Sequence, residues 1–294
     1  RNFAFKKPYA PVEYYIYTQK RIFIDQMQYL QANHLKMWNI FRIFAVNLTE
    51  TVLNLVIDIG NNSAKFFLFK GEQIILHTRR ENTTFDVIDE WSKLYEIEKA
   101  IISSVVTDID GLQEQLSRLQ CPVLRFDNSI PLPLEIAYRT PATLGSDRIA
   151  AAVGAWSEAP AHNILVIDAG SAITIDFVGK DGKYNGGNIA PGIKMRLRAL
   201  HEYTSKLPMV DKEGDTPAIG YDTETAIRSG VINGICHEID GYINEFKQKY
   251  CDVLVFLTGG DEKPLKNRIK SCIFADKYLV AKGLNRILND YGNK

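Results

Sequence analysis

Two stretches of this chain repeat one pattern: an apolar strand, an Asp-x-Gly turn with small polar residues, and a second strand. They are Asn54–Phe69 (NLVIDIGNNSAKFFLF) and Ile164–Val178 (ILVIDAGSAITIDFV). Each apolar run delivers an aspartate, Asp58 or Asp168, to a turn where glycine lets backbone N–H groups approach an anion closely. The two turns lie about 110 residues apart. This repeat predicts two similar halves that face each other across a phosphate-binding cleft, which is typical of a kinase.

The length and charge of the chain narrow the class of ligand. A chain of 294 residues can form two domains, since single cores stop growing near roughly 250 to 300 residues. The hydrophobic share of 46% and the charged share of 24% are ordinary for globular proteins. The 35 basic and 35 acidic residues give no net charge, without the basic excess of a protein that grips nucleic acid nonspecifically. We therefore expect a small-molecule ligand and no nucleic-acid partner.

Cysteine spacing and hydropathy bear on the compartment. The cysteines are scattered and form no Cys-x-x-Cys pair, which argues against a zinc site or a disulfide framework. No apolar stretch approaches the ~18 to 20 residues that span a bilayer, and the start shows no clean signal-peptide pattern. These features predict a cytoplasmic protein with reduced thiols and no membrane partner.

Several other enzyme classes find little support. The histidines show no metal-ligand spacing, and no Gly-x-Ser-x-Gly elbow indicates acyl chemistry. The glycine-rich run Gly186–Gly192 resembles a phosphate loop, but Gly187–Lys194 does not satisfy the Walker pattern. We interpret these glycines as sites of close packing near the cleft.

Residues 1–52 form an extension without a recognisable motif. The segment is rich in Tyr, Phe and Ile and begins without Met. It is either upstream sequence translated from a misassigned start, with the true beginning at or after Met37, or a helical extension around Phe23–Phe44. We leave it out of the fold argument, because the predicted function does not depend on it.

Hydrophobic periodicity outlines the rest of the chain. After the first hairpin we expect a helix and then a strand over Ala100–Val106, giving β-β-α-β order, and a helix and a short strand follow. In the second half a helix precedes the second hairpin, and a third strand closes near Gly192. The expected helices are Thr84–Tyr95, Gly111–Leu119, Asp147–Trp156, Ile193–Tyr203, Thr223–Lys249 and Lys277–Asn289, and the later strands are Pro122–Phe126 and Val253–Leu257. Mixed sheets flanked by helices result.

The first turn has the residue types that phosphoryl transfer requires. Asp58 could organise Mg²⁺ and the transferred group, and Lys65 could supply a positive charge. Hydrogen-bond donors would come from the polar residues of the turn, Asn61, Asn62 and Ser63. Alone, the Asp-x-Gly sequence would more often be a simple β-turn, but its recurrence at Asp168 favours the functional interpretation.

The segment Leu144–Arg148 places an aspartate near a helix start. Asp147 alone would more often be a helix N-cap. Facing the cleft, its carboxylate could accept the proton of an attacking alcohol, and the Arg148 guanidinium could hold a substrate carboxylate or phosphate. Thr258-Gly259-Gly260 follows a buried strand and suits a backbone beside a nucleotide. The alternative interpretation is a plain strand-ending turn.

These residues, taken in order, resemble the type III pantothenate kinase family. The motifs are Asp58-x-Gly-Asn, Gly145-x-Asp147-Arg148, Asp168-x-Gly-Ser-Ala, Gly186-Gly-x-Ile-x-Pro-Gly192, Leu207-Pro208 and Thr258-Gly-Gly. The resemblance covers about residues 53 to 290. Each motif is weak alone, but their shared order is specific.

The resemblance implies a fold of the acetate kinase, sugar kinase, Hsp70 and actin superfamily. Two ribonuclease-H-like (actin-like ATPase) domains would have mixed five-stranded sheets flanked by helices, with a cleft between them. They would span residues 53–140 and 141–294. The implied activity is ATP-dependent phosphorylation of the 4′-hydroxyl of pantothenate, the first step of coenzyme A biosynthesis, by a homodimer that uses Mg²⁺ and a monovalent cation, K⁺ or NH₄⁺.

The resemblance also assigns roles to individual residues. Asp147 matches the catalytic proton acceptor, and Asp168 matches the monovalent-cation ligand. ATP would bind Asp58, Ile59, Gly60, Asn61, Asn62, Ser63, Ala64, Lys65 and Ser171. Pantothenate would bind Tyr138, Gly145, Ser146, Asp147 and Arg148, with Thr223 reaching it across the dimer interface.

The chain departs from the family pattern in three places. Asn62 and Ser63 replace the usual Asn-Thr sequence, Ser171 replaces the usual Thr, and the extension is unexpected. The serines keep a hydroxyl and Asn62 keeps a donor and an acceptor, so nucleotide affinity changes more readily than mechanism. Two alternatives are another small-molecule kinase of the superfamily and a nucleotide-binding regulatory factor without turnover.

Overall fold

The computed structural model describes residues 53–60, 63–81, 84–105, 111–127 and 129–291. The chain divides into two compact units, Arg1–Thr51 and Val52–Lys294, and every described residue belongs to the second. The two interpretations of the extension therefore lie outside the described residues, as do Asn61 and Asn62.

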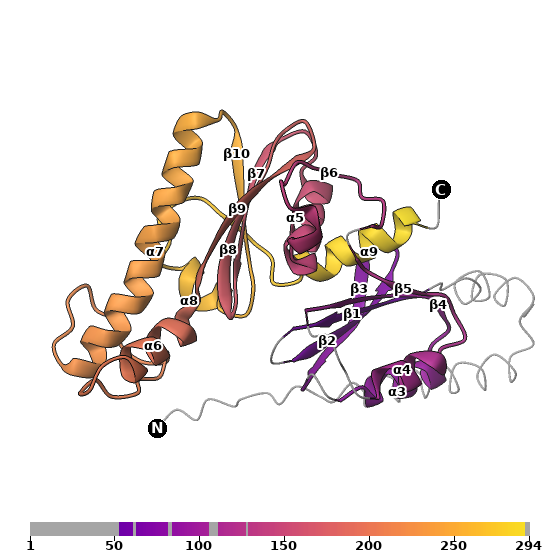
Figure 1. The fold of residues 1–294 in the computed structure, drawn as a ribbon, viewed down its shortest axis with the longest axis horizontal. Coiled ribbons are helices and arrows are strands. Elements are labelled where there is room, and N and C mark those ends of the chain that lie inside the picture. The colour runs from indigo at the N-terminus through magenta and orange to yellow at the C-terminus, as the bar shows by residue number, and fades with distance from the viewer. Residues whose placement is uncertain (1–52, 61–62, 82–83, 106–110, 128, 292–294) are drawn as a thin grey trace, which may run out of the picture. The chain divides into compact units, whose positions relative to one another are not determined.

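The first sheet is mixed and has five strands, as predicted (Figure 1). Its strands are β1 (Leu53–Ile59), β2 (Ala64–Lys70), β3 (Gln73–Arg80), β4 (Ile97–Ser104) and β5 (Val123–Arg125). Their spatial order is β3-β2-β1-β4-β5, with β2 antiparallel to both neighbours and β4 parallel to β1 and β5. The predicted β-β-α-β order was wrong, because β3 follows the first hairpin before helix α3 (Asp86–Leu94).

One face of the first sheet is covered by two short helices. α3 buries Val87, Ile88 and Trp91, and α4 (Leu112–Ser117) buries Leu112 and Leu116. These side chains share a cluster with Leu55, Ile57 and other apolar residues of β1, β2 and β4. Phe66 of β2 meets the Trp91 ring edge to face at 6.5 Å.

The second sheet has six strands instead of the predicted five. Its strands are β6 (Glu135–Ile136), β7 (Asn163–Ala169), β8 (Ala172–Val178), β9 (Lys183–Pro191), β10 (Val253–Thr258) and β11 (Phe274–Ala275), in the order β11-β10-β7-β8-β9-β6. The edge strands β6 and β11 have two residues each, too few for a hydrophobic pattern to reveal. β6 pairs with β9, so this sheet takes in residues before position 141.

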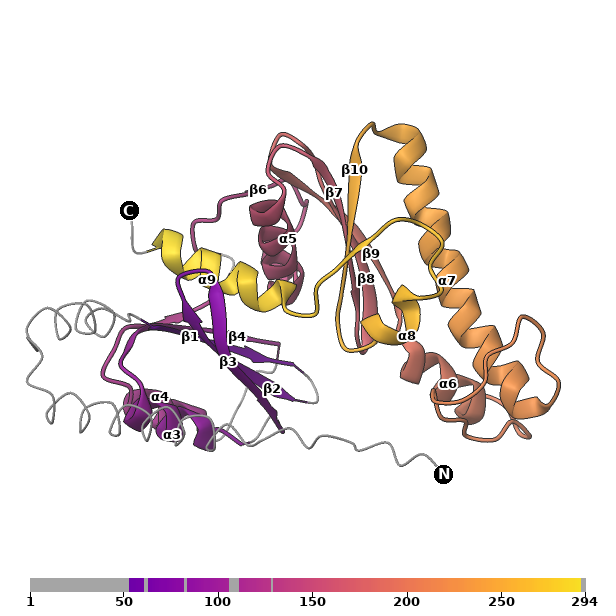
Figure 2. The same ribbon diagram turned by 180° about the vertical axis from the view of Figure 1, so that it is seen from behind.

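Helices cover both faces of the second sheet (Figures 1 and 2). α6 (Ile193–Glu202), α7 (Thr223–Lys249) and α8 (Glu262–Lys266) contribute to a cluster with Leu165, Ile175 and Val255 of the sheet. α5 (Ser146–Glu158) and α9 (Leu279–Tyr291) contribute to a different cluster with Ile164 and Val166. A short 3₁₀ turn, Pro141–Thr143, precedes α5. Among the described residues, none of these helices is both long and apolar enough to cross a membrane.

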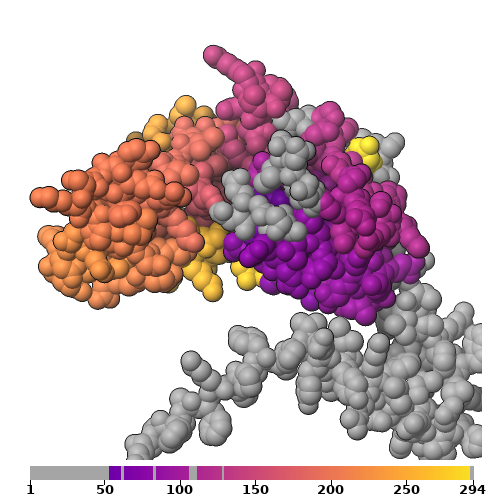
Figure 3. All heavy atoms as spheres, turned by 60° about the horizontal axis from the view of Figure 1, so that its bottom comes forward, coloured from indigo at the N-terminus to yellow at the C-terminus, as the bar shows by residue number. Residues whose placement is uncertain are grey.

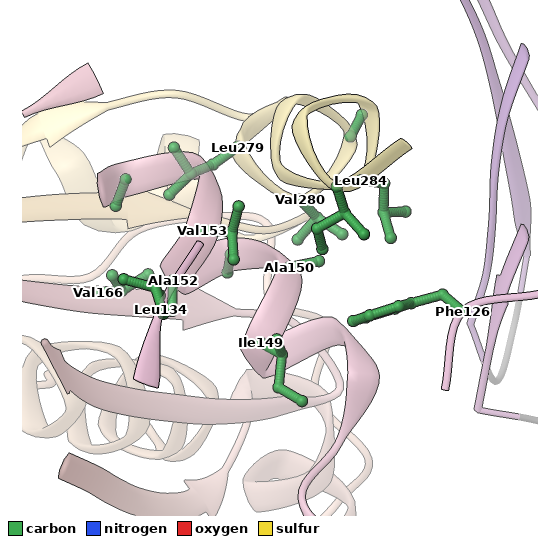
Figure 4. Close-up of a cluster of buried hydrophobic side chains, with 14 of the residues drawn as sticks. Phe126, Leu134, Ile149, Ala150, Ala152, Val153, Val166, Leu279, Val280 and Leu284 are labelled. Carbon is green, nitrogen blue, oxygen red and sulfur yellow. The ribbon is translucent and has the colours of Figure 1, made fainter. Parts of the chain in front are cut away.

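α5 and α9 pack closely because glycines lie where they cross. A Cβ at Gly154 would be 2.3 Å from the carbonyl oxygen of Leu279, and a Cβ at Gly283 would be 1.8 Å from that of Ala150. Figure 4 shows Val153 and Ala150 of α5 beside Leu279, Val280 and Leu284 of α9, with Phe126 reaching in from the end of β5. This cluster also contains Val56, Phe67 and Phe69, so it joins the two sheets.

Asparagines fasten α9 to the first sheet. Asn54 of β1 donates to Oδ1 of Asn285 at 2.7 Å and to Oδ1 of Asn289 at 2.9 Å. Asn285 in turn donates to the carbonyl oxygen of Gly71 at 2.8 Å, in the turn between β2 and β3. Asn54 and Asn285 are buried, and paired polar groups in an apolar setting fix one arrangement of the elements that carry them.

Candidate active site

The two aspartates of the repeat occupy equivalent positions. Asp58 is the next-to-last residue of β1, and Asp168 is the next-to-last residue of β7. In each sheet the strand turns into an antiparallel partner, which places Lys65 opposite Asp58 and Thr174 opposite Asp168. The predicted hairpins are confirmed, and the carboxylates sit at their turns.

The first turn holds an ion pair. Nζ of Lys65 donates to Oδ2 of Asp58 at 2.9 Å, and Asp58 is buried. Burial alone would lower the pKa of Lys65, but the charge and hydrogen bond of Asp58, with a further contribution from Asp168, raise it. Gly60 N donates to Ser63 O at 3.0 Å and closes the turn. The Lys65 ammonium group therefore interacts electrostatically with both Asp58 and Asp168.

The Asp168 carboxyl group has a pKa raised to about 7. Burial is the main cause, and the negative charges of Asp147 and Asp58 add to it, while Lys65 opposes the shift. Gly259, which follows β10, has a φ of 99°, and a Cβ there would be 2.4 Å from Oδ1 of Asp168. The predicted glycine turn after β10 thus lies directly against the second aspartate.

Asp147 is the second residue of α5, and the N-cap is Gly145. The alternative interpretation of Asp147 as the N-cap is therefore wrong. Its Oδ1 accepts a hydrogen bond from the backbone N–H of Arg148 at 2.8 Å, and a Cβ at position 145 would lie 2.5 Å from the same oxygen. Burial raises the pKa of Asp147, and the charges of Asp58 and Asp176 raise it further.

A serine pair joins the first sheet to the start of α5. Ser103 and Ser146 have hydroxyl oxygens 2.9 Å apart, and Ser103 is 1% exposed. Ser103 lies beside Asp58 in the register of β4 and β1. Ser103 was not predicted from the sequence, where the signal was a pair of serines within the apolar run AIISSVV.

Arg148 belongs to a buried polar network. Its Nε donates to Oδ1 of Asp176 at 3.0 Å, and the hydroxyl of Tyr184 donates to the same oxygen at 2.6 Å. Burial would lower the pKa of Arg148, but Asp176 outweighs burial and raises it. Tyr138 lies at this network, with its ring centroid 5.8 Å from the guanidinium carbon. Asp176 and Tyr184 were missed, although an aspartate inside the apolar run ITIDFV was a signal.

The glycines within β9 and directly after it pack closely against their neighbours, as predicted from the sequence. A Cβ at Gly186 would be 3.1 Å from the Tyr138 ring, and one at Gly187 would be 2.6 Å from Oδ1 of Asp176. At the second turn Gly192 N donates to the carbonyl oxygen of Ser171 at 3.2 Å. Ser171 therefore lies on the exposed turn that follows Asp168, backed by the glycine-rich segment.

Thr223 lies in different surroundings. It is the exposed first residue of α7, whose start is fixed by a capping box between Asp222 and Thr225. It lines an open, largely apolar groove of about 800 Å³ together with Arg196, Ala199, Leu200, Tyr203, Thr204, Leu207, Ala226, Ile227, Gly230 and Val231. Figure 3 shows the surface of α6, the loop that follows it and α7 in salmon and orange.

The carboxylates suit a metal that is completed by substrate. Within the described part of the chain, no three His, Cys, Asp or Glu side chains are grouped so that they could hold a metal ion. Mg²⁺ in phosphoryl-transfer sites commonly takes one or two carboxylates and fills its remaining positions with phosphate oxygens and water. Asp58, Asp147 and Asp168 interact through their charges, so the cluster favours added cations.

Comparisons with known proteins identify the family of this chain. The family model of type III pantothenate kinase matches residues 54–245. A type III pantothenate kinase of Bacteroides fragilis is 49% identical over 241 residues, covering 82% of this chain and 99% of the relative. One from Phocaeicola vulgatus is 46% identical over 242 residues, covering 82% of this chain and 100% of the relative.

A solved structure agrees in fold. It is that of a protein from Campylobacter jejuni named as a Baf family transcriptional activator, which is 25% identical and has a TM-score of 0.54. The similarity covers 82% of this chain and 100% of that one. The family model, the curated relatives and the two mixed sheets all agree with the resemblance drawn from the motifs. This chain belongs to the type III pantothenate kinase family.

Proposed function

We propose that this chain transfers the γ-phosphoryl group of ATP to the primary 4′-hydroxyl of pantothenate, with Asp147 as the proton acceptor. The family is that of the kinase of the first step of coenzyme A biosynthesis. The observation that carries the residue assignment is the convergence of Asp58, Asp147 and Asp168, which come from two sheets and a helix start and interact through their charges.

Asp147 has the properties of a general base. Its pKa is raised by burial and by neighbouring carboxylates, which moves it towards the working pH, where a base is most effective. Gly145 leaves the space that the carboxylate occupies, and Ser146 is held by Ser103. In this mechanism Asp147 orients the alcohol and takes its proton as the oxygen attacks phosphorus.

The repeated turns would bind the nucleotide phosphates. Lys65 supplies the positive charge and is paired with Asp58. Ser63 closes the first turn by accepting the Gly60 N–H, and Ser171 occupies the second turn. Asp58 would hold Mg²⁺, which would neutralise charge on the phosphates. The protein then contributes mainly position and fixed charge, which dominate the catalysis of phosphoryl transfer.

Two further residue groups complete the proposal. Tyr138, Gly145, Ser146 and Arg148 would line the pantothenate pocket, because Gly145, Ser146 and Arg148 flank Asp147 in the chain and Tyr138 lies against the Arg148 guanidinium. Asp168 would hold K⁺ or NH₄⁺, because a carboxyl group crowded by other carboxylates is stabilised in its ionised form by a cation.

A second copy of the chain would cover the groove between α6 and α7. Its lining is mainly apolar, and Tyr203, Met209, Ile219 and Tyr221 nearby in the sequence are exposed. Contiguous exposed apolar surface commonly marks a protein interface. Thr223 lies in this groove, which supports the proposal that it reaches pantothenate bound by the partner. The cytoplasmic location expected from composition stays a prediction.

An ATP-consumption assay with and without pantothenate tests the proposed function. Consumption that depends on pantothenate and yields a phosphate monoester supports it. Consumption that instead requires a sugar or an acyl acid would identify another small-molecule kinase of the superfamily. Nucleotide binding without consumption would identify the regulatory alternative. Either of the last two results contradicts the proposal.

A further inference from the structure

Arg148 and Asp176 form a buried ion pair directly behind the proposed base. Arg148 is 6% exposed and Asp176 is fully buried. The guanidinium Nε lies 3.0 Å from Oδ1 and 3.3 Å from Oδ2 of Asp176, and Nη2 also donates to Oδ1. One edge of the guanidinium is therefore committed to the interior of the second sheet.

The Asp176 carboxylate is itself fixed. The Tyr184 hydroxyl donates to Oδ1 at 2.6 Å, and Tyr184 is also fully buried. Gly187 lies opposite Asp176 in the β8–β9 register, and a side chain there would collide with the carboxylate. The Tyr184 hydroxyl and the close backbone at Gly187 hold the carboxylate in one orientation, so Asp176 determines where the guanidinium lies.

The competing partner for Arg148 is its own neighbour in the sequence. Asp147 carries a carboxylate beside the guanidinium, and arginine pairs strongly with carboxylates through two parallel hydrogen bonds. Such a pair would occupy the oxygens that must receive the alcohol proton. In the described part of the structure, Asp147 instead accepts a hydrogen bond from the backbone N–H of Arg148 and forms no ion pair with the guanidinium.

We propose that Asp176 is a positioning residue for phosphoryl transfer. It holds the Nε and Nη2 edge of Arg148 in the interior, which keeps Asp147 available to the substrate alcohol. The rest of the guanidinium, which is hydrogen-bonded to Tyr138, would then be fixed where a substrate carboxylate binds. This inference rests on the proposed function, because it needs a reaction in which Asp147 is the base and the substrate is an anion.

The first test is a double-mutant cycle on the full chain. Asp176→Asn keeps the side-chain volume but removes the charge that holds Arg148, so the KM for pantothenate should rise about tenfold. Arg148→Met removes the residue that Asp176 acts through. In that background Asp176→Asn should change kcat/KM less than about threefold, because residues that act as one unit are not additive. If the two substitutions lower kcat/KM by independent factors that multiply in the double variant, the inference is overturned.

The second test is the pH profile of kcat. Asp147 faces the charges of Asp58, Asp168 and Asp176 and the opposing charge of Arg148. Asp176→Asn removes one repulsion and frees the guanidinium, so the acidic limb should move to lower pH. Tyr184→Phe keeps both charges and should leave that limb in place. A limb that does not move in Asp176→Asn contradicts the inference.

Matched variants separate the possible failures. Asp181→Asn changes an exposed aspartate in the β8–β9 turn and should leave KM and the pH profile unchanged. If Asp176→Asn does not fold, the double variant, in which neither charge is left unpaired, is compared with Arg148→Met alone, and equal kcat/KM supports the inference. A wild-type chain without pantothenate-dependent ATP consumption overturns the proposed function and the role of Asp176 together.

Discussion

Gly283 lies so close to Ala150 that a Cβ at position 283 would be 1.8 Å from the Ala150 carbonyl oxygen. The backbones of α9 and α5 are therefore in direct contact, without side chains between them. This contact lies within the cluster that joins the two sheets, so its geometry sets the spacing of the elements that carry the aspartates.

Gly283→Ala should destabilise the protein by about 1 to 3 kcal/mol, because α9 must move away from α5 to admit the methyl group. Urea unfolding measures the change. Gly241→Ala is the matched control, since Gly241 is an exposed position within α7 where nothing lies within 4 Å of an added Cβ. It should stabilise by about 0.5 to 1 kcal/mol through helix propensity. Equal unfolding midpoints for Gly283→Ala and the wild type would contradict the contact.

Asp147→Asn should lower kcat by about 10²-fold or more while the protein stays folded. The amide oxygen can still accept the Arg148 backbone N–H, so the helix start keeps its hydrogen bond. Steady-state kinetics and a thermal unfolding curve on the same preparation measure both quantities. Unchanged turnover in the folded variant would rule out Asp147 as the base.

Asp168 should make the ligand-free protein less stable as the pH rises. Its pKa is raised from 3.8 to about 7, so the folded state holds a proton that the unfolded state has already lost. The stability that this proton contributes is complete below about pH 4 and is lost as the pH rises through about 7. Asp168→Asn, compared with the wild type by urea unfolding without added K⁺, should gain relative stability between pH 5 and pH 8. The same difference at both pH values would show that Asp168 is not responsible.

Bound K⁺ should stabilise the folded protein when the Asp168 carboxyl group is ionised, which is the opposite of the destabilisation expected without the cation. A cation that binds the ionised Asp168 carboxylate raises the Tm of the wild type more at pH 8 than at pH 5, because the proton no longer competes. The comparison uses Na⁺ at equal ionic strength. A similar K⁺ effect in Asp168→Asn would place the cation elsewhere.

Ala226→Glu should convert the proposed homodimer to a monomer, because it places a charge in the apolar groove that holds Thr223. Sedimentation velocity measures the mass, and the KM for pantothenate should rise as the dimer dissociates. Leu94→Glu, at an exposed apolar position of α3 outside the groove, is the control and should leave the mass unchanged. A dimer that survives Ala226→Glu would place the interface on another surface.

The sequence predicted those parts of the fold whose pattern is local. Both hairpins are confirmed, and α7 has the predicted bounds because its capping box begins at Asp222 and its apolar residues recur at helical spacing. β3 was missed because its positions alternate between exposed and half-buried, so that QIILHTRR never presents a fully buried apolar run. β6 and β11 depend on pairing across the sheet, which no local pattern encodes.

The same distinction between local patterns and long-range contacts applies to the candidate site. Asp58 and Asp168 were identifiable because the turn is repeated, and Asp147 because the residues around it match a family motif. Ser103 and Asp176 could not be assigned, since each acts through a partner distant in the sequence, Ser146 or Arg148. Residues whose role is to hold another residue become visible only when the chain is folded.

The hydrogen bond between Asn54 and Asn285 joins residues 231 positions apart, and it has a consequence for synthesis on the ribosome. Among the described elements, the strands of the first sheet are translated well before α9, the helix that covers one of their faces. Until α9 leaves the exit tunnel, Val56, Phe67 and Phe69 lack the apolar partners that it supplies. The nascent chain must therefore carry an incomplete domain until α9 has been made, and a stop codon before Leu279 would leave that domain permanently open.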